Sequence, residues 1–280
     1  MTKKAYIIGY PIGHSLSPTM HNAAAKALGI DLEYIPKKVK PKDLAKALKE
    51  LRGPDVIGFN ITVPHKEAIV PLLDDLSKPA QIIGAVNTVV NENGKLIGHN
   101  TDGAGFIESL KEDAKTAPKD KNVVILGAGG ASRAVSVMLA EAEVAFLTIT
   151  DIQEEKAKGL IEYVSSYFQT NCNLVKPNSP ELQETINKAD ILVNCTPIGM
   201  HPKGKDSPLS PDIKLHANLL VYDLVYNPRE TQLLKSAQTA GGRTCSGLGM
   251  LVRQGALAFT LWTHQEAPVA TMRQAAEKSL

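Results

Sequence analysis

Short apolar runs rich in β-branched residues alternate with helical patterns along most of the chain. The first run predicts a strand at residues 5–12. Ser17 is a favourable N-cap residue, and Pro18 fits the first helical position, so a helix is expected to reach residue 28. The pattern then predicts strands at 32–39 and 56–63, a helix at 41–51, a hairpin of 86–91 and 95–100 around Glu92-Asn93-Gly94, and a helix at 102–114.

The second half of the chain shows the alternation more regularly. A run with three β-branched residues at 122–126 leads directly into glycines and a helix. Further strands are expected at 145–150, 191–195 and 219–226, and two closing helices at 247–262 and 268–278. Strands that alternate with helices imply right-handed crossovers and a parallel sheet. The sequence therefore predicts an α/β fold.

The order of the elements predicts two α/β domains, of which the first is discontinuous. We expect residues 1–102 to form the first domain, completed by residues 241–280. Residues 103–240, including a connecting helix, would form the second. A length of 280 residues is comfortable for two cores.

Composition narrows the class of protein. With 31 basic and 29 acidic residues the net charge is only +2, which favours neither a nucleic acid nor a membrane surface as partner. The chain contains no long apolar run, and its N-terminus is typical of a first strand rather than a secretory signal. Three cysteines at no metal-like spacing indicate free thiols in a reducing cytoplasm. The seven histidines show no ligand spacing, so no metal site is expected.

A glycine-rich turn follows the strand at 122–126 and opens a helix. Gly127 permits a tight turn, Gly129 allows a pyrophosphate to approach the backbone, and the helix N-terminus favours an anion. Ala131 or Ser132 is small enough for the third position of the motif. The next strand ends at Asp151, whose carboxylate can accept hydrogen bonds from ribose hydroxyls. This context predicts a Rossmann-type dinucleotide-binding domain, although the glycines could also form only a turn and Asp151 only a helix cap.

The residues around Asp151 bear on the choice of dinucleotide. A carboxylate repels a 2′-phosphate, and the following Ile152 supplies no positive charge to hold one. Arg133, in the first turn of the preceding helix, is the nearest counter-argument. These residues favour NAD over NADP.

Polar residues of the first domain cluster where predicted strands end. Such loops at the carboxyl ends of strands form the ligand crevice of open α/β sheets. Each residue alone has a simpler interpretation: Ser17 could be a helix cap, Thr62 and Asn87 could satisfy backbone groups, and Lys66 could be a solvated lysine. Together, the hydroxyls, amides, one lysine and one aspartate suit a small polyhydroxylated acid.

The chain resembles the shikimate dehydrogenase family almost from end to end. The motifs that carry the resemblance are GYPIGHSLSPTMHNA (9–23), NITVPHK (60–66), GAVNTVV (84–90), GHNTDGAGF (98–106), GAGGASRA (127–134), NCTPIGM (194–200), DLVYNPRETQLL (223–234) and GLGMLVRQGALAF (247–259). The resemblance implies an N-terminal substrate-binding domain beside the dinucleotide-binding domain. It also implies an enzyme that interconverts 3-dehydroshikimate and shikimate with NAD or NADP, in the pathway to chorismate and aromatic amino acids.

By this resemblance Lys66 and Asp102 form the catalytic pair. A lysine within hydrogen-bond reach can stabilise the developing alkoxide and donate its proton, while an aspartate beside it keeps the amine charged and oriented. The substrate would contact Ser15, Ser17, Thr62, Asn87, Tyr226 and Gln254, and the cofactor would contact Gly127, Ala128, Gly129, Gly130, Ala131, Asp151, Thr196, Leu224, Gly247 and Met250. Tyr226 could instead be a buried strand-end tyrosine, and Gln254 a polar residue on a helix face.

One departure from the family pattern affects the cofactor. Members that use NADP typically carry asparagine, arginine and threonine where this chain has Asp151-Ile152-Gln153. We therefore expect NAD preference or dual use. This departure makes a quinate/shikimate dehydrogenase the nearest alternative, whereas both serines of HSLSP favour shikimate.

Two more distant alternatives remain at this point. A methylenetetrahydrofolate dehydrogenase also has two α/β domains and a lysine, but the HSLSP and NTD motifs argue against it. A metabolite sensor without activity would not need both Lys66 and Asp102. His14, His65 and His99 adjoin the motifs and are interpreted as structural. The protein is expected to be a monomer or homodimer that binds a small molecule.

Overall fold

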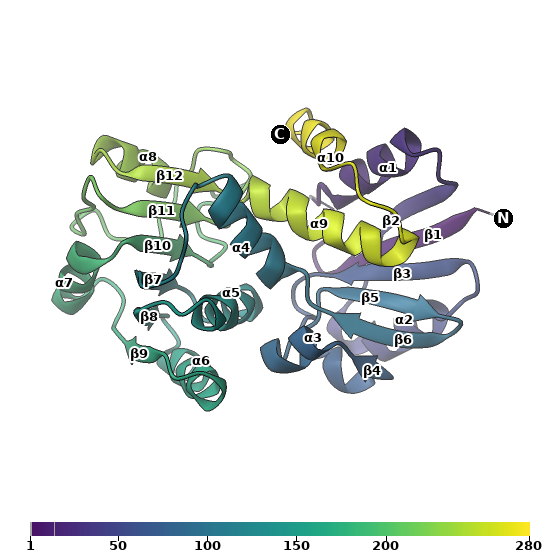
Figure 1. Ribbon diagram of the computed structural model, residues 1–280, viewed down its shortest axis with the longest axis horizontal. Coiled ribbons are helices and arrows are strands. Elements are labelled where there is room, and N and C mark those ends of the chain that lie inside the picture. Colours follow the sequence, from purple (N-terminus) through teal and green to yellow (C-terminus); the bar gives the residue numbers. More distant parts are fainter. Residues whose placement is uncertain (1, 14) are drawn as a thin grey trace. The chain divides into compact units, whose positions relative to one another are not determined.

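The computed structural model describes residues 2–13 and 15–280 and divides into two compact units. The first unit comprises Met1–Gly105 and Val252–Ser279, and the second comprises Phe106–Leu251 with Leu280. Two helices contain the boundaries: α4 (Asp102–Glu112) and α9 (Leu248–Thr263). Each unit is an α/β layer structure, which confirms the predicted fold class (Figure 1).

The described residues of the first unit form a six-stranded mixed sheet in the order β2-β1-β3-β5-β6-β4. The strands are β1 (Lys3–Gly9), β2 (Leu32–Lys38), β3 (Val56–Ile61), β4 (Asp75–Leu76), β5 (Thr88–Glu92) and β6 (Lys95–His99). The strand β1 pairs parallel with β2 and β3, whereas β5 runs antiparallel to β3 and β6. The helices are α1 (Ser17–Ala27), α2 (Leu44–Glu50), α3 (Lys78–Ile83) and α10 (Val269–Glu277), with 3₁₀ turns at Pro41–Asp43 and Val70–Leu72.

Both faces of this sheet are covered. On one face Ile8, Phe59 and Val89 pack with Leu44 and Leu48 of α2 in a continuous apolar core. The other face carries an aromatic cluster to which α1, β2 and α9 each contribute; its members are His21, Tyr34, Phe259 and Trp262. In Figure 1, α1, α9 and α10 lie beside β1 and β2. The C-terminal segment thus completes the first unit.

The predicted hairpin is confirmed, and its turn chemistry explains its geometry. Strands β5 and β6 pair antiparallel across a two-residue loop, Asn93-Gly94. Both loop residues have positive φ, 54° and 91°, as a type I′ turn requires. The Asn91 side chain accepts a hydrogen bond from the Gly94 N–H at 2.7 Å and fixes the turn.

One local prediction in the first unit is wrong, and the bounds of another change. Ser17 does not cap α1, because the helix begins at Ser17 itself and Leu16 occupies the N-cap position. The Ser17 N–H instead donates to the Ser15 hydroxyl oxygen at 3.2 Å. The helix expected at 41–51 begins as a 3₁₀ turn at Pro41–Asp43 and becomes α-helical only at Leu44–Glu50.

The described part of the second unit forms a parallel six-stranded sheet in the order β12-β11-β10-β7-β8-β9. Its strands are β7 (Asn122–Leu126), β8 (Phe146–Thr150), β9 (Asn171–Leu174), β10 (Ile191–Asn194), β11 (Leu220–Asp223) and β12 (Arg243–Ser246). Counted from β7, this is the 3-2-1-4-5-6 strand order of the Rossmann fold. The helices are α5 (Gly130–Glu141), α6 (Glu154–Tyr167), α7 (Pro180–Lys188) and α8 (Gln232–Thr239).

Alternation along the strands separates the two faces of this sheet. Val124, Leu192 and Val221 point to the face on which α7 and α8 pack. On the other face Tyr222 of β11 packs edge-on against Phe106 of α4, with ring centroids 5.1 Å apart. The Rossmann unit therefore has helices on both faces, as a parallel sheet requires.

The structural boundary near the C-terminus differs from the predicted one. The sequence predicts that residues 241–280 complete the first domain, whereas residues 241–251 and Leu280 group with the second unit. The reason is a strand that the sequence pattern did not reveal: β12 pairs parallel with β11. Arg243 also donates hydrogen bonds to the Ala114 carbonyl and the Thr116 hydroxyl of the second unit.

Among the described residues, no helix is both long enough and apolar enough to cross a bilayer.

His21 is expected to make the stability of the protein depend on pH. Its ring is fully buried and stacks on Tyr34 at 4.3 Å, and neither ring nitrogen has a hydrogen-bond partner among the described residues. Burial lowers its pKa from 6.5 to about 3. The unfolded chain therefore binds a proton below pH 6.5 that the folded protein refuses, so stability is full above that pH and falls as pH drops toward 3.

Denaturant titration at two pH values tests this effect. Between pH 7 and pH 5 we expect His21 to account for a loss of about 2 kcal/mol in the free energy of unfolding. His21→Phe keeps an aromatic ring in the cluster and removes the titrating group, so its pH dependence should be smaller by that amount. Equal pH dependence in both proteins would contradict the assignment.

Candidate active site

Lys66 and Asp102 form a short ion pair in the first unit. Lys66 Nζ donates to Asp102 Oδ2 at 2.6 Å, and the two side chains are only 17% and 8% exposed. The other ion pairs of this unit's surface, such as Lys4 with Asp55, are more exposed. A shielded ammonium held by a carboxylate is suited to stabilise an oxyanion and to exchange a proton with it.

The segment that carries Lys66 is anchored on both sides. The buried ring of His65 donates from Nε2 to the Val39 carbonyl oxygen at 2.8 Å. The carbonyl oxygen of Lys66 accepts a hydrogen bond from Val86 N at 2.8 Å. These bonds fix the backbone next to the amine, so the position of Lys66 is set by the loop after β3 rather than by a helix.

Asn87 lies at the centre of a buried polar cluster. Its amide nitrogen donates to the Thr101 hydroxyl at 2.9 Å and to Gln254 Oε1 at 3.3 Å, and its oxygen accepts from Thr101 N at 2.7 Å. Thr101 directly precedes Asp102. The structure thus brings together two predicted substrate residues, Asn87 and Gln254, and links them to the chain at Asp102.

The remaining polar residues predicted for the substrate lie at strand ends. Ser15 is half-buried before α1, and Ser17 is buried in its first turn. Thr62 is half-buried directly after β3, where its backbone N–H donates to Ile8 of β1 at 2.9 Å. His14, within the same motif as the serines, lies outside the described residues. Tyr226 belongs to the second unit, where burial raises its pKa.

The glycine turn of the second unit has the geometry that the motif predicts. Gly127 has φ +99°, and a Cβ at this position would lie 2.9 Å from Thr196 Cγ2. Gly129 occupies the N-cap of α5, and a Cβ there would meet nothing within 4 Å. The Ser132 hydroxyl donates to the Gly127 carbonyl oxygen at 2.6 Å. With Ala128, Gly130 and Ala131, these residues form an open turn at a helix N-terminus, where backbone N–H groups can hold an anion.

Asp151 is tied to this turn by hydrogen bonds. Its Oδ2 accepts from Ala128 N and its Oδ1 from Gln153 N, each at 2.7 Å. The carboxylate therefore both fixes the glycine turn and begins the segment that leads into α6. Ile152 beside it is 87% exposed. Arg133 has its guanidinium stacked over the Tyr163 ring of α6, 3.7 Å from the ring centroid.

A buried carboxylate, Asp223, lies beside two further predicted cofactor residues: Leu224 follows it in the chain, and Thr196 is linked to it through Asn194. The Asp223 carboxylate accepts hydrogen bonds from Asn194 Nδ2, Thr231 Oγ1 and Val225 N. Burial raises its pKa, and these three donors oppose the shift.

Hydrogen bonds and close packing hold the predicted cofactor residues of the neighbouring loops. The Asn194 oxygen accepts from both N and Oγ1 of Thr196. Gly247 packs directly against the backbone of Leu224, where a Cβ would clash with the Leu224 carbonyl oxygen. Met250 is buried in the first turn of α9.

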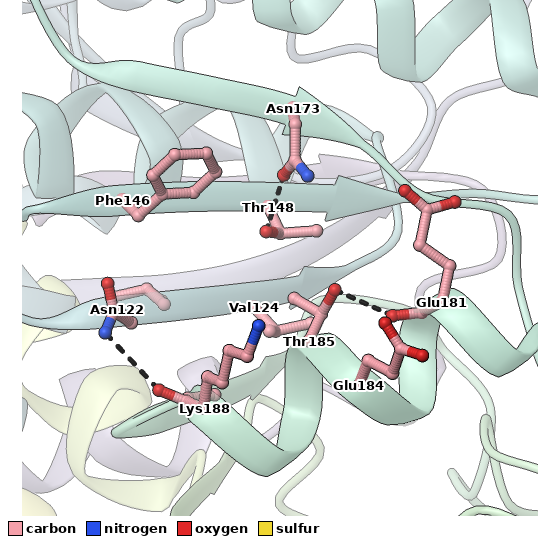
Figure 2. A pocket seen from close by; sticks show the side chains of 11 residues that line it. Asn122, Val124, Phe146, Thr148, Asn173, Glu181, Glu184, Thr185 and Lys188 are labelled. Carbon is pink, nitrogen blue, oxygen red and sulfur yellow. Dashed lines mark hydrogen bonds between the residues drawn. The ribbon is translucent and has the colours of Figure 1, made fainter.

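A surface groove of about 390 Å³ lies elsewhere in the second unit (Figure 2). Asn122 and Phe146, the first residues of β7 and β8, line it together with Glu181, Glu184 and Lys188 of α7. The glycine turn follows the opposite, carboxyl end of β7. The groove contains none of the predicted site residues.

Some residues that shape the sites were not predicted. Tyr34, Asn60 and Thr101 bond to predicted substrate residues or to each other, and Asn194 and Asp223 hold the cofactor loops. Asn60, Thr101, Asn194 and Asp223 lie within the family motifs, so that signal could have found them. Tyr34 lies outside every motif, and only the fold reveals it. No group of three or more possible metal-binding residues occurs in the part of the chain that the structure describes.

The Rossmann unit with its open glycine turn and the first unit with its shielded lysine–carboxylate pair together define a nicotinamide-dependent dehydrogenase. Comparison with family descriptions gives three matches. Residues 7–89 match "Shikimate dehydrogenase substrate binding domain", residues 247–277 match "Shikimate 5'-dehydrogenase C-terminal domain", and residues 123–203 match "Saccharopine dehydrogenase NADP binding domain".

Similar proteins agree with these matches. The shikimate dehydrogenase (NADP(+)) of Methanopyrus kandleri is 44% identical over 96% of this chain and 93% of its own length. A crystal structure of a shikimate dehydrogenase with NADP+ has a TM-score of 0.92, 39% identity and coverage of 99% and 95%. The Listeria monocytogenes enzyme with shikimate and NAD has a TM-score of 0.89, 38% identity and coverage of 98% and 96%. The chain belongs to the shikimate dehydrogenase family.

Proposed function

We propose that this protein catalyses the reversible oxidation of shikimate to 3-dehydroshikimate with a nicotinamide cofactor. The observation that carries the proposal is the shielded Lys66–Asp102 pair, 2.6 Å long, in the unit that matches the substrate-binding domain. The small net charge of +2 on 280 residues also fits a small-molecule substrate better than a polyanion.

Lys66 acts on the oxygen at C3 of the substrate. In the reducing direction the carbonyl takes a hydride and becomes an alkoxide, and the Lys66 ammonium stabilises that charge and donates its proton. In the oxidising direction the neutral amine accepts the hydroxyl proton. Asp102 holds the amine in position through the 2.6 Å hydrogen bond. The bound cofactor supplies or accepts the hydride.

The substrate is held by uncharged donors. Ser15 and Ser17 bind its carboxylate, and Thr62, Asn87, Tyr226 and Gln254 bind the carboxylate or ring hydroxyls. Hydroxyl and amide groups hold an anion less strongly than arginine does. Exclusion of water from the site strengthens their hydrogen bonds to the carboxylate.

The dinucleotide is held by the second unit. Backbone N–H groups of residues 127–131 bind the pyrophosphate, with Asp151 at the adenosine ribose. Thr196, Leu224, Gly247 and Met250 lie along the ribose and nicotinamide. The open space at Gly129 supports this placement, because no side chain covers the turn there.

We also propose that NAD is used at least as well as NADP. The Asp151 carboxylate repels a 2′-phosphate. The exposed residue beside it, Ile152, carries no positive charge that could bind one. The stacking of Arg133 on Tyr163 holds that guanidinium against α6. The Listeria monocytogenes relative, solved with NAD, supports NAD use within the family, whereas the Methanopyrus kandleri relative is named for NADP(+).

Initial rates with purified protein test the function. Shikimate should reduce NAD and NADP, with the higher kcat/KM for NAD, and quinate should be a poorer substrate. Absence of turnover with both cofactors would contradict the dehydrogenase proposal and favour a binding protein. Faster turnover of quinate than of shikimate would assign the chain to the quinate branch. A cytoplasmic location and a monomeric or homodimeric state stay predictions.

A further inference from the structure

We propose that the Tyr34 hydroxyl is a positioning group that sets the orientation of the substrate-binding residues of the first unit. The inference rests on the proposed function, because it assigns shikimate to this site. Tyr34 lies on β2, the edge strand beside β1 and α1 in Figure 1, and outside the motifs shared with the family. It acts through neighbouring side chains and not on the substrate itself.

Tyr34 is held rigidly. Its side chain is only 2% exposed, and its ring stacks almost parallel on His21 at 4.3 Å. Its backbone N–H and carbonyl both bond to the Asn22 side chain, at 2.8 and 3.0 Å. Burial raises the pKa of the phenol, so the hydroxyl keeps its proton and remains a donor at neutral pH.

That donor fixes the amide of Asn60. The Tyr34 hydroxyl donates to Asn60 Oδ1 at 2.7 Å, so the Asn60 amide nitrogen must face the other way. There it donates to the Thr88 hydroxyl at 2.9 Å and to the Asn87 carbonyl oxygen at 3.1 Å. A flipped amide would bring its oxygen against the Asn87 carbonyl, which repels it. The tyrosine hydroxyl thus selects one of two amide orientations.

The orientation of the Asn60 amide also fixes the hydrogen bonds of the residues near Asp102. Because the Thr88 oxygen accepts from Asn60, its proton is free to bond to Asn87 Oδ1, 3.2 Å away. Asn87 Oδ1 also accepts from Thr101 N at 2.7 Å, and its nitrogen faces Gln254. One continuous chain of buried bonds therefore runs from Tyr34 to the residue that precedes Asp102.

The same hydroxyl contacts the serine side of the site. Ser17 interacts with the Tyr34 hydroxyl closely enough to oppose the rise that burial causes in the tyrosine pKa. Tyr34 therefore joins a proposed carboxylate ligand, Ser17, to a proposed hydroxyl ligand, Asn87.

Tyr34→Phe tests the inference, since it removes only the hydroxyl and leaves the ring stacked on His21. We expect kcat/KM for shikimate to fall about 10- to 100-fold, because a buried acceptor loses its donor. The KM for the cofactor should stay within about twofold of wild type, because the Rossmann unit is untouched.

Tyr222→Phe is the matched control. Tyr222 is fully buried and its hydroxyl also donates at 2.7 Å, to Ser109 of the second unit, so the two variants lose comparable bonds. The control should lose stability with little change in kcat/KM for shikimate. Equal effects of the two variants on shikimate kinetics would assign Tyr34 a merely structural role and overturn the inference.

Asn60→Ala breaks the same chain of hydrogen bonds at its second residue, so it tests the inference even if Tyr34→Phe does not fold. We expect a similar loss in kcat/KM, and the Tyr34→Phe change should cost much less on the Asn60→Ala background than alone. Additive losses would show that Tyr34 and Asn60 act independently and would contradict the shared chain of hydrogen bonds.

The two proposals can fail separately. Wild-type protein without shikimate turnover would refute the proposed function, whereas active wild type with fully active Tyr34→Phe would refute this inference alone.

Discussion

Replacement of Lys66 by methionine is expected to lower kcat for shikimate oxidation about 1,000-fold, within the usual range for loss of a positioned acid–base group. Methionine keeps the apolar stem but cannot accept the hydroxyl proton or stabilise an alkoxide. The Asp102 carboxylate, 8% exposed, also loses its ammonium partner, so some loss of stability accompanies the loss of rate. Single-turnover measurement of cofactor reduction separates the chemical step from binding.

Lys4→Met is the matched control for this experiment. Lys4 also donates to a carboxylate of the first unit, Asp55, at 2.9 Å, but both partners are more exposed. Loss of that pair should leave kcat unchanged and alter stability little, as for most surface ion pairs. If Lys66→Met retained more than about a tenth of wild-type kcat, proton transfer by Lys66 could not supply the 10²- to 10⁴-fold that such catalysis contributes.

The double change Asp151→Asn with Ile152→Arg is expected to raise the ratio of kcat/KM for NADP to that for NAD about 100-fold. The asparagine removes the charge that repels a 2′-phosphate. The arginine, at a position that is 87% exposed, adds a guanidinium able to form charge-assisted, bidentate bonds to it. Initial rates with each cofactor at saturating shikimate give the ratio directly.

Asp190→Asn controls for the loss of a carboxylate that supports the backbone. Asp190 Oδ2 accepts from Asn122 N at 2.9 Å, much as Asp151 accepts from Ala128 N, but at the amino end of β7. This control should leave the cofactor ratio unchanged. An unaltered ratio in the double variant would show that 2′-phosphate recognition lies elsewhere, and a wild-type preference for NADP would contradict the role given to Asp151.

Local sequence patterns predicted the Rossmann unit well because its signals are local. The strand at 122–126, the glycine turn and the helix after it follow one another without interruption, and the structure has β7 at Asn122–Leu126. The positive φ of Gly127 and the open N-terminus of α5 are what such a turn requires. By contrast, β12 contains an arginine, a cysteine and only one β-branched residue, so only its pairing with β11 identifies it.

The polar network of the first unit could be predicted only in part. The motifs point to Asn87 and Asp102, and the structure joins Asn87 to Thr101 and Gln254, which is 167 positions away along the chain. The hydrogen bond of Tyr34 to Asn60 depends on strands β2 and β3 lying on either side of β1, a tertiary arrangement with no local signal. The prediction that Ser17 caps α1 failed for a local reason, since the helix begins at Ser17 itself and the Ser17 N–H bonds to the Ser15 hydroxyl.

Hydride transfer from C3 of shikimate to the nicotinamide is the central claim, and isotope labelling tests it most directly. Shikimate carrying deuterium at C3 is incubated with the protein and NAD or NADP, and the reduced cofactor is analysed by mass spectrometry. We predict that one deuterium moves to the cofactor in each turnover, and that Lys66→Met slows the transfer without changing its destination. Reduced cofactor without deuterium, or no transfer to either cofactor while shikimate binds, would contradict this account.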